Sequence, residues 1–218
     1  MSAPAYAVRR SDRARRVQVR VRDDGVIEVV LPRRAPERLA DEAIVELAPW
    51  IARRQAEVEA VRARLAARGD TLPYLDETLT LRVEPARTRV HRRGDVLLVP
   101  GADTEVAIER WYRRAARAEV APRVAEATAA LGVSAEKITI RNQRSRWGSC
   151  SASGALSFNW RLLLAPSEIL DYVVWHEACH LVHLDHSHAF WALLASHRPG
   201  YKTEQRWLRR HGATLVLS

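Results

Sequence analysis

Cysteine is scarce in this 218-residue chain, because Cys150 and Cys179 are the only two. Two cysteines cannot build a disulfide framework, and their spacing matches no zinc site made of cysteines alone. Long apolar runs are also missing: no stretch approaches the roughly 18 to 20 apolar residues of a membrane span. No apolar run follows the arginines near the N-terminus, so a secretory signal is not expected. We therefore expect a soluble, cytoplasmic protein with no membrane partner.

Lysine is nearly absent as well, since Lys137 and Lys202 are the only lysines among 35 basic residues. The chain nevertheless carries a formal net charge of +9. Arginine in place of lysine, alongside much alanine and valine, is typical of a genome-wide compositional bias, and solvated basic faces would account for it. A surface for a nucleotide or a nucleic acid is the alternative. The charge alone does not decide between them.

The first part of the chain alternates strand and helix patterns. Its composition, 47% apolar, allows a real core in one large domain or two small ones, and there is no internal repeat or low-complexity linker. Residues 15–32 alternate apolar and polar positions around an Asp-Asp-Gly turn, which predicts a β-hairpin. Residues 36–69 place apolar side chains at helical spacing, and Pro49 is expected to divide them into two helices.

The middle of the chain predicts a second set of strands and then a long helix. Residues 72–100 alternate again, with a turn at Gly94. Residues 103–131 form one amphipathic pattern that should end near Gly132. Further strands and helices are expected beyond it.

The second half carries the chemistry. Residues 137–164 look like a β-hairpin, with the segment RSRWGSCSASG at its turn. Ser167 is a favoured helix N-cap, and apolar side chains and histidines follow it at offsets of three and four residues. We therefore expect a helix that runs to about Leu184.

Inside this expected helix lies HEACH, an HExxH motif formed by His176, Glu177 and His180. Four residues advance a helix by about 400° and about 6 Å, so both imidazoles share one face and can reach one metal ion. Glu177 is offset by about 100° and flanks the metal's water, from which it can take a proton. So short a pattern can also arise by chance, but the histidines that follow it argue for a metal site.

The third metal ligand is less defined. A catalytic zinc takes three protein ligands and keeps one position open for water. His183 is rejected, because three imidazoles in a row on a straight helix cannot converge on one ion. His186 and His188 qualify if the helix ends before them and the chain folds back, which Asp185 and Ser187 permit. Geometry leaves both histidines open.

The segments RWGSC, NWRL, DYVVWHEACH and HSHAFW, in this order within residues 144–191, resemble the YgjP-like metallopeptidase family, which is related to SprT-like proteins. The resemblance extends along nearly the whole chain, including the N-terminal segment RRSDRARRVQVRVRDDGVIEVVLPRRAP. It implies a peptide substrate, Glu177 as the catalytic acid/base, and His176, His180 and His186 as the metal ligands. It leaves His188 in a position that the family does not use.

The RWGSC segment has two interpretations. In the functional one, the hairpin forms the upper rim of an active-site cleft, and Arg144 or Arg146 faces an anionic group or the substrate backbone. In the structural one, Trp147 and Cys150 fill the core, and Gly148 supplies a turn conformation closed to other residues. We favour the structural interpretation except for the arginines. Other side chains near the motif are expected in the core: Trp175, Cys179 and Trp191.

These observations predict an α+β fold whose zincin-like metallohydrolase half follows a β-hairpin-rich and helical N-terminal half. A weak boundary near residue 100 would separate an N-terminal region, residues 1–100, from the zincin-like domain, residues 101–218, although one compact unit is also possible.

The predicted activity is zinc-dependent hydrolysis of a peptide or protein, with Glu177 as general base. Alternatives are hydrolysis of a nucleotide phosphoanhydride and a DNA-associated protease-like module. Basic residues around the cleft would favour a nucleotide, basic residues on a separate face would favour DNA, and an open groove along the hairpin edge would favour a peptide.

Overall fold

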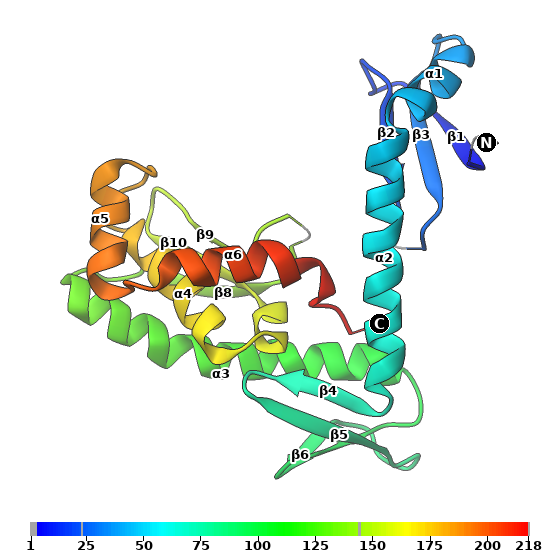
Figure 1. The fold of residues 1–218 in the computed structure, drawn as a ribbon. Helices are drawn as coiled ribbons and strands as arrows, with labels where there is room; N and C mark the ends of the chain where they lie inside the picture. Colours follow the sequence, from blue (N-terminus) through cyan, green and yellow to red (C-terminus); the bar gives the residue numbers. More distant parts are fainter. Residues whose placement is uncertain (1–3, 23, 144, 218) are drawn as a thin grey trace. The chain divides into compact units, whose positions relative to one another are not determined.

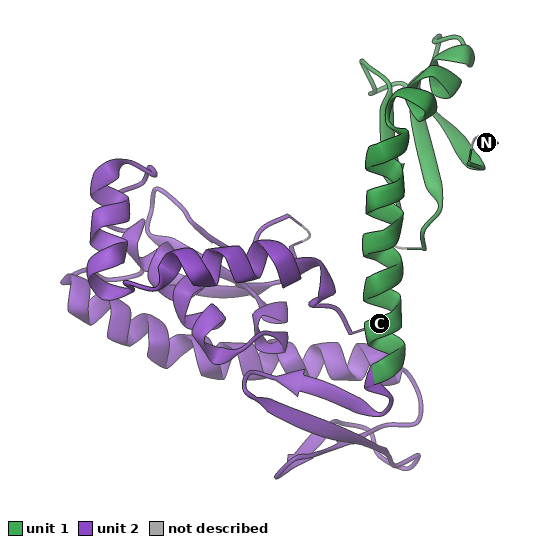
Figure 2. Cartoon of the chain, viewed as in Figure 1, with its two compact units in different colours: residues 1–67 green, residues 68–218 purple. Residues whose placement is uncertain are grey.

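The computed structural model describes residues 4–22, 24–143 and 145–217. By their internal contacts the residues form two compact units, Met1–Ala67 and Arg68–Ser218, which Figure 2 colours separately. Each unit combines helices with a small sheet or sheets, so the α+β class is confirmed (Figure 1). Among the described residues, no helix has both the length and the apolar character needed to cross a membrane.

The first unit is built on three strands, β1 (Tyr6–Ser11), β2 (Gln18–Val21) and β3 (Ile27–Pro32), in the order β1-β3-β2. Strands β2 and β3 are antiparallel, so the predicted hairpin is confirmed, and Gly25 in its turn has a φ of 79° that favours glycine. Strand β1 pairs with β3 in parallel, which the alternation did not predict.

Two helices complete this unit, α1 (Arg38–Glu46) and α2 (Ala48–Arg68), and the break between them falls beside Pro49 as expected. The core of the unit combines alternate side chains of β3 with one face of the helices: Ile27, Val29, Leu31, Ala40, Ile44 and Ile51. All of these side chains are almost fully removed from solvent.

The second unit begins with a four-stranded sheet of β4 (Thr71–Tyr74), β5 (Glu77–Val83), β6 (His91–Arg93) and β7 (Val96–Val99), ordered β4-β5-β7-β6. Its buried side chains belong to the same core as the helices that follow in sequence. The compact units therefore divide at residues 67 and 68, whereas the sequence suggested a weak boundary near residue 100.

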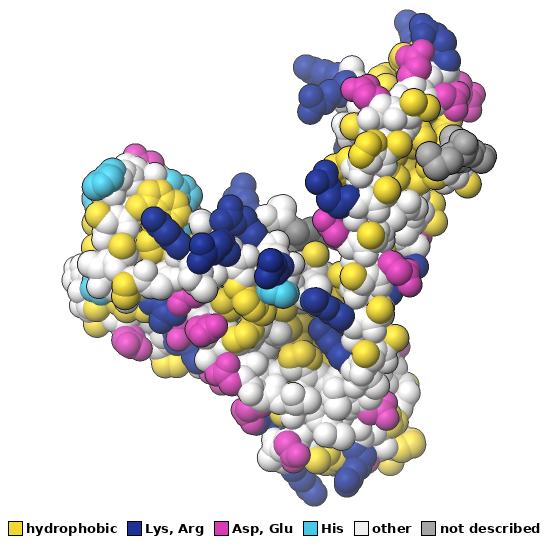
Figure 3. All heavy atoms as spheres, in the orientation of Figure 1, with side chains coloured by type: hydrophobic (Ala, Val, Ile, Leu, Met, Phe, Trp, Pro, Cys, Tyr) yellow, Lys and Arg dark blue, Asp and Glu magenta, His cyan; other side chains and the backbone are white. Residues whose placement is uncertain are grey.

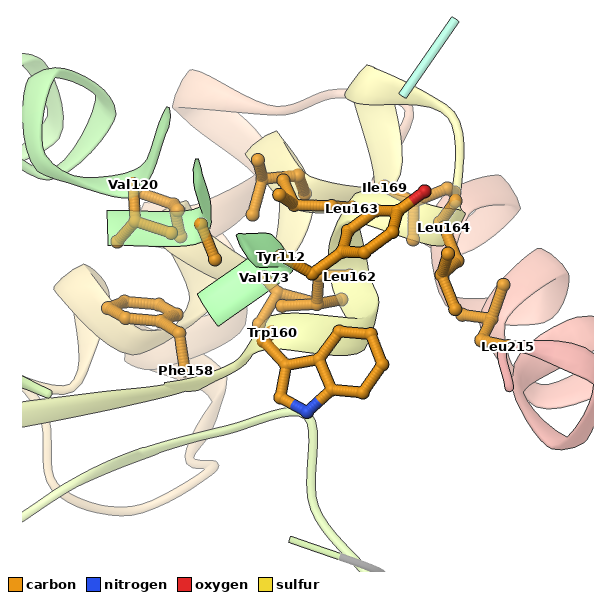
Figure 4. Close-up of a cluster of buried hydrophobic side chains, with 14 of the residues drawn as sticks. Tyr112, Val120, Phe158, Trp160, Leu162, Leu163, Leu164, Ile169, Val173 and Leu215 are labelled. Atoms are coloured by element: carbon orange, nitrogen blue, oxygen red, sulfur yellow. The ribbon is translucent and has the colours of Figure 1, made fainter. Parts of the chain in front are cut away.

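Helix α3 (Thr104–Leu131) matches its prediction and ends at Gly132, whose φ of 66° closes the helix in the left-handed conformation. Its buried face carries side chains four residues apart, including Tyr112, Ala116, Val120 and Val124. Figure 4 shows how this face meets β10, the segment after it and α4, with these residues labelled: Tyr112, Val120, Phe158, Trp160, Leu162, Leu163, Leu164, Ile169, Val173 and Leu215.

The sheet beside the HExxH helix differs from its prediction. Strands β8 (Lys137–Arg141), β9 (Gly148–Cys150) and β10 (Ala155–Asn159) are ordered β8-β10-β9. The predicted 137–164 hairpin is wrong in its pairing, because β8 runs parallel to β10 and only β9 and β10 form a hairpin. Alternation gives the faces of a strand but not the direction of its partner. After Asn159 the chain turns into the 3-10 helix η1 (Trp160–Leu164).

The C-terminal helices are α4 (Ser167–Cys179), α5 (His188–His197) and α6 (Tyr201–His211), followed by the 3-10 turn η2 (Gly212–Thr214). The prediction that the HExxH helix runs to about Leu184 is wrong. The amides of Leu181 and Val182 donate to carbonyls three residues back, which tightens the chain and ends α4 at Cys179.

The start of α4 also differs from its prediction. Ser167 is the first helical residue rather than the N-cap, and its amide and hydroxyl both donate to the carboxylate of Asp76. Asp76 follows β4, so a side chain distant in sequence satisfies the first turn of the helix that carries the motif.

Candidate metal centre

The structure brings three of the five clustered histidines together. His176 lies in the last turn of α4, His180 occupies its C-cap, and His186 comes from the turn before α5. Their candidate ligand nitrogens all lie within 4.8 Å of one another, and Nε2 of His176 is 3.1 Å from Nε2 of His186. Among the described residues, His183 and His188 do not belong to this cluster.

The turn after α4 carries His186 back toward the helix. Asp185 accepts a hydrogen bond from the amide of Ser187 (3.1 Å), and Ser187 caps α5 by accepting one from the amide of Phe190 (3.5 Å). This is the change of direction that Asp185 and Ser187 were expected to permit. It holds His186 between two anchored neighbours.

His180 is oriented by the main chain of the same turn. Its Nδ1 lies 2.9 Å from the carbonyl oxygen of His183. Because a carbonyl can only accept, Nδ1–H is the donor, and the neutral ring keeps Nε2 as an acceptor facing the cluster. His183 therefore serves the site through its backbone rather than its side chain. Hydrogen bonds of this kind fix the tautomer of a metal-binding histidine.

One buried aromatic ring supports all three imidazoles. Phe190, fully buried in α5, stacks on His180 with ring centroids 4.4 Å apart. It also makes T-shaped contacts with His176 and His186, with centroid distances of 5.0 Å and 4.9 Å. On the outer side, Trp191 stacks on His186 at 5.4 Å. Sequence reasoning placed Trp191 in the core and did not single out Phe190. The position of Phe190, three residues after the N-cap Ser187, was the available signal.

Burial controls the charge of the histidines. Desolvation, with smaller contributions from His180 and His186, lowers the pKa of His176 to about 3. Desolvation also lowers the pKa of His180. His176 and His180 are therefore neutral near pH 7, and the neutral imidazole is the form that binds a metal ion. Nδ1 of His176 has no hydrogen-bond partner among the described residues.

Glu177 is buried beside the cluster, with 6% of its surface exposed. Desolvation raises the pKa of its carboxyl to about 8, and the nearby Arg146 opposes this shift. A buried carboxyl group with a raised pKa, close to histidines and to one cation, is typical of a group that exchanges protons during a reaction.

Gly148 makes room for that carboxylate. A Cβ atom at this position would lie 2.5 Å from Oε1 of Glu177 and 2.6 Å from its Cγ. The prediction that Gly148 supplies a special turn conformation is wrong, because Gly148 lies in β9 and its φ is not positive. Glycine is needed here for close approach of the strand to the side chain.

The segment before β9 is tied to the end of β10. The buried side chain of Asn159 donates to the carbonyls of Gln143 (2.6 Å) and Arg146 (3.2 Å), and it accepts from the amide of Arg161 (3.1 Å). The guanidinium of Arg146 is exposed, and its charge reaches Glu177. Arg144 lies outside the described residues.

The remaining side chains of the motif region pack as the structural interpretation expected. Trp147 and Cys150 are half-buried against the main core. A Cβ at Gly212 would lie 2.9 Å from the Trp147 ring, so the end of α6 closes tightly over it. Cys179 is fully buried, and Trp175 is half-buried and stacks on His197 at 4.5 Å.

Comparison with known proteins gives one family and one solved structure. The model of the family described as YgjP-like, metallopeptidase domain, matches residues 15–211. The crystal structure of the metallopeptidase zymogen abylysin of Pyrococcus abyssi is 23% identical, with a TM-score of 0.38, and the match covers 42% of this chain and 93% of that chain. A search of curated proteins found no similar sequence.

Proposed function

Because this chain belongs to the YgjP-like metallopeptidase family, we propose that it is a zinc peptidase in which His176, His180 and His186 hold the metal. The observation that carries the proposal is the convergence of three imidazoles on one point beside a buried carboxylate. Glu177 is the general base in this proposal, and it does not bind the metal.

The donor set suits zinc. Zinc binds imidazole nitrogen readily, and its catalytic sites take three protein ligands and leave one position for water. Two of the three imidazoles are buried enough to stay neutral, and the third, His186, is exposed and gives access from solvent. When bound, zinc would polarise the carbonyl of the substrate and make a water molecule more acidic.

Glu177 and Arg146 have separate roles in this proposal. The carboxylate of Glu177 accepts a proton from the attacking water and then delivers it to the amine nitrogen that leaves. Burial, only partly opposed by Arg146, raises the pKa of Glu177 to about 8 and so favours its protonated form near pH 7; the charge of a bound zinc ion would add to that of Arg146 in favouring the carboxylate that accepts the proton. Gly148 leaves the space that the carboxylate of Glu177 occupies. Phe190 packs against the imidazoles and holds their orientation.

A peptide substrate is supported by the sheet beside the site. Strand β9 stands at the edge of the order β8-β10-β9, and among the described residues it pairs only with β10. An extended peptide can add to such an edge through main-chain hydrogen bonds. Gly148 begins β9 and touches Glu177, so a peptide at this edge would pass directly beside the general base.

A substrate screen tests the proposed class of reaction. The full-length protein, stripped with a chelator and reloaded with zinc, is incubated with unfolded casein-like polypeptides and, separately, with nucleoside triphosphates. We expect peptide cleavage that disappears on stripping and returns with zinc. Release of phosphate from the nucleotides with intact polypeptides would contradict a peptidase and favour the phosphoanhydride hydrolase.

A further inference from the structure

Helix α6 concentrates positive charge on its exposed side. Lys202, Arg206, Arg209 and Arg210 are all exposed, and Figure 3 shows Lys and Arg side chains gathered over this helix. The single acidic residue of α6, Glu204, is largely covered and pairs with Arg198. The exposed side of the helix therefore presents cations with no acidic residue among them.

These cations line a hollow rather than a flat surface. A pocket of about 300 Å³ opens between α6 and the start of α5, and its wall combines two aromatic rings with three cations and one amide: Trp191, Tyr201, Lys202, Gln205, Arg206 and Arg209. We refer to this hollow as the α6 pocket. No carboxylate lines it, so its charge is complementary to an anion.

The three cations of the α6 pocket are available for a ligand. None of them forms an ion pair with a carboxylate of the described residues, whereas Arg123 and Arg198 of the same unit are both paired. Arg206 donates to the hydroxyl of Thr203 (3.1 Å), and Nζ of Lys202 lies 6.0 Å from the centre of the Tyr201 ring. An exposed cation without an acidic neighbour gains from meeting one.

A continuous stack of rings joins this pocket to the histidine cluster. Trp191 stacks on both His186 and Tyr201, with a centroid distance of 5.4 Å in each pair. Trp191 and Tyr201 both line the α6 pocket. The far ring of the pocket, Tyr201, is therefore two ring-to-ring steps away from a proposed metal ligand.

We propose that the α6 pocket is a substrate subsite that binds an Asp or Glu side chain of the peptide. The inference rests on the proposed peptidase function and names a preference of that same site. An extended peptide advances about 3.3 Å per residue, so the two steps of 5.4 Å correspond to at most about three residues. The acidic residue is therefore expected within about three positions of the bond that is cleaved.

A side chain, rather than the C-terminal carboxylate, fits the shape of this surface. Arg206 and Arg209 also line a second hollow of about 580 Å³, together with Trp207 and Arg210, so the cationic surface extends beyond the α6 pocket. A peptide can therefore run on beyond the pocket, whereas a subsite for a chain terminus would close behind it.

The first arm of the test maps cleavage sites. The zinc-loaded full-length protein digests a proteome-derived peptide library, prepared both with free and with amidated C-termini, and the cut positions are read by mass spectrometry. We expect Asp and Glu to be enriched at one position within about three residues of the cut in both libraries. The double variant Arg206→Gln/Arg209→Gln should lose this enrichment. A matched control on α3, Arg110→Gln/Arg114→Gln, removes the same charge from exposed positions and should keep it.

The second arm does not depend on turnover. In a Glu177→Gln background, fluorescence anisotropy compares a labelled alanine-rich peptide that carries a central pair of glutamates with the same peptide carrying glutamines. We expect the glutamate probe to bind about 3- to 10-fold more tightly at low salt, and the α6 double variant to remove the difference. If the zinc-loaded protein with Glu177 unchanged cleaves no peptide in the first arm while this difference in binding is present, the peptidase proposal fails and the subsite stands.

Three results would overturn the subsite. One is equal binding of both probes, or a preference that survives in the α6 double variant. The second is enrichment that depends on a free C-terminus, which would assign the pocket to the terminal carboxylate. The third is displacement of the glutamate probe by single-stranded DNA at a lower concentration than by unlabelled peptide, which would make this face a nucleic-acid surface.

Discussion

Replacing Gly148 with alanine should disable the site without changing a histidine or the general base. The new Cβ would lie 2.5 Å from Oε1, 2.6 Å from Cγ and 2.8 Å from Cδ of Glu177. Non-bonded carbon atoms rest about 3.5–4.0 Å apart, so the carboxylate has to move by about 1 Å. A displacement of that size in a catalytic group costs about 10²-fold in rate. We expect kcat/KM for a peptide substrate to fall by about that factor while the metal content is unchanged.

The assay combines steady-state kinetics, elemental analysis and a thermal melt. Overpacking costs about 1–3 kcal/mol, so a lower Tm is expected, and kinetics are measured well below it. Gly200→Ala is the matched control, because a Cβ there meets nothing within 4 Å. If both substitutions act through one carboxylate, Gly148→Ala combined with Glu177→Gln should be no slower than Glu177→Gln alone. Near-normal kcat/KM in Gly148→Ala, or losses that multiply in the double variant, would refute this reasoning.

Three further predictions follow from other parts of the site. His186→Ala should lose most of the metal affinity in a competition with a chromogenic chelator, whereas His183→Ala and His188→Ala should retain it; the reverse pattern would move the third ligand. Hydrogen bonds from the first residue of α4 lower the pKa of Asp76 below 3.8, so its contribution to stability is present above that pH and is lost as the pH falls through the lowered value. The Tm deficit of Asp76→Asn should therefore be full at pH 7 and shrink in strong acid, and a deficit independent of pH would contradict this. Asn159→Ala removes the donor to the carbonyl of Arg146, one of two donors to the carbonyl of Gln143 and the acceptor of the Arg161 amide, so it should cost about 1–3 kcal/mol in chemical denaturation; no loss would show that water replaces the amide.

Local patterns in the sequence were enough to predict the elements that carry the site. The spacing of His176 and His180 depends only on helical geometry, and both lie where α4 presents them to one point. Gly132 ends α3 and Ser187 caps α5 because these signals act within a few residues. The α+β class follows from the same alternation and helical spacing.

The features that were missed depend on contacts between distant segments. Nothing near Gly148 in sequence shows that Glu177, on another element, will press against it. The carboxylate of Asp76, which satisfies the start of α4, likewise comes from a turn far upstream. The parallel pairing of β8 with β10 depends on the path of the chain between the two strands. The alternation of residues within each strand does not predict it. The early end of α4 at Cys179 belongs to the same group, because it depends on how the following turn packs.

The rate of peptide hydrolysis by Glu177→Gln, measured at the same zinc content per chain as the unchanged protein, tests the central claim most directly. Glutamine has nearly the same shape but cannot accept the proton of the attacking water, so turnover should fall by about 10²–10⁴-fold with zinc fully retained. Glu168→Gln, an exposed carboxylate on the same helix, should keep its activity. Loss of zinc from Glu177→Gln would make this residue a ligand, and full activity with zinc retained would assign the proton transfer to another group; either result would contradict the account.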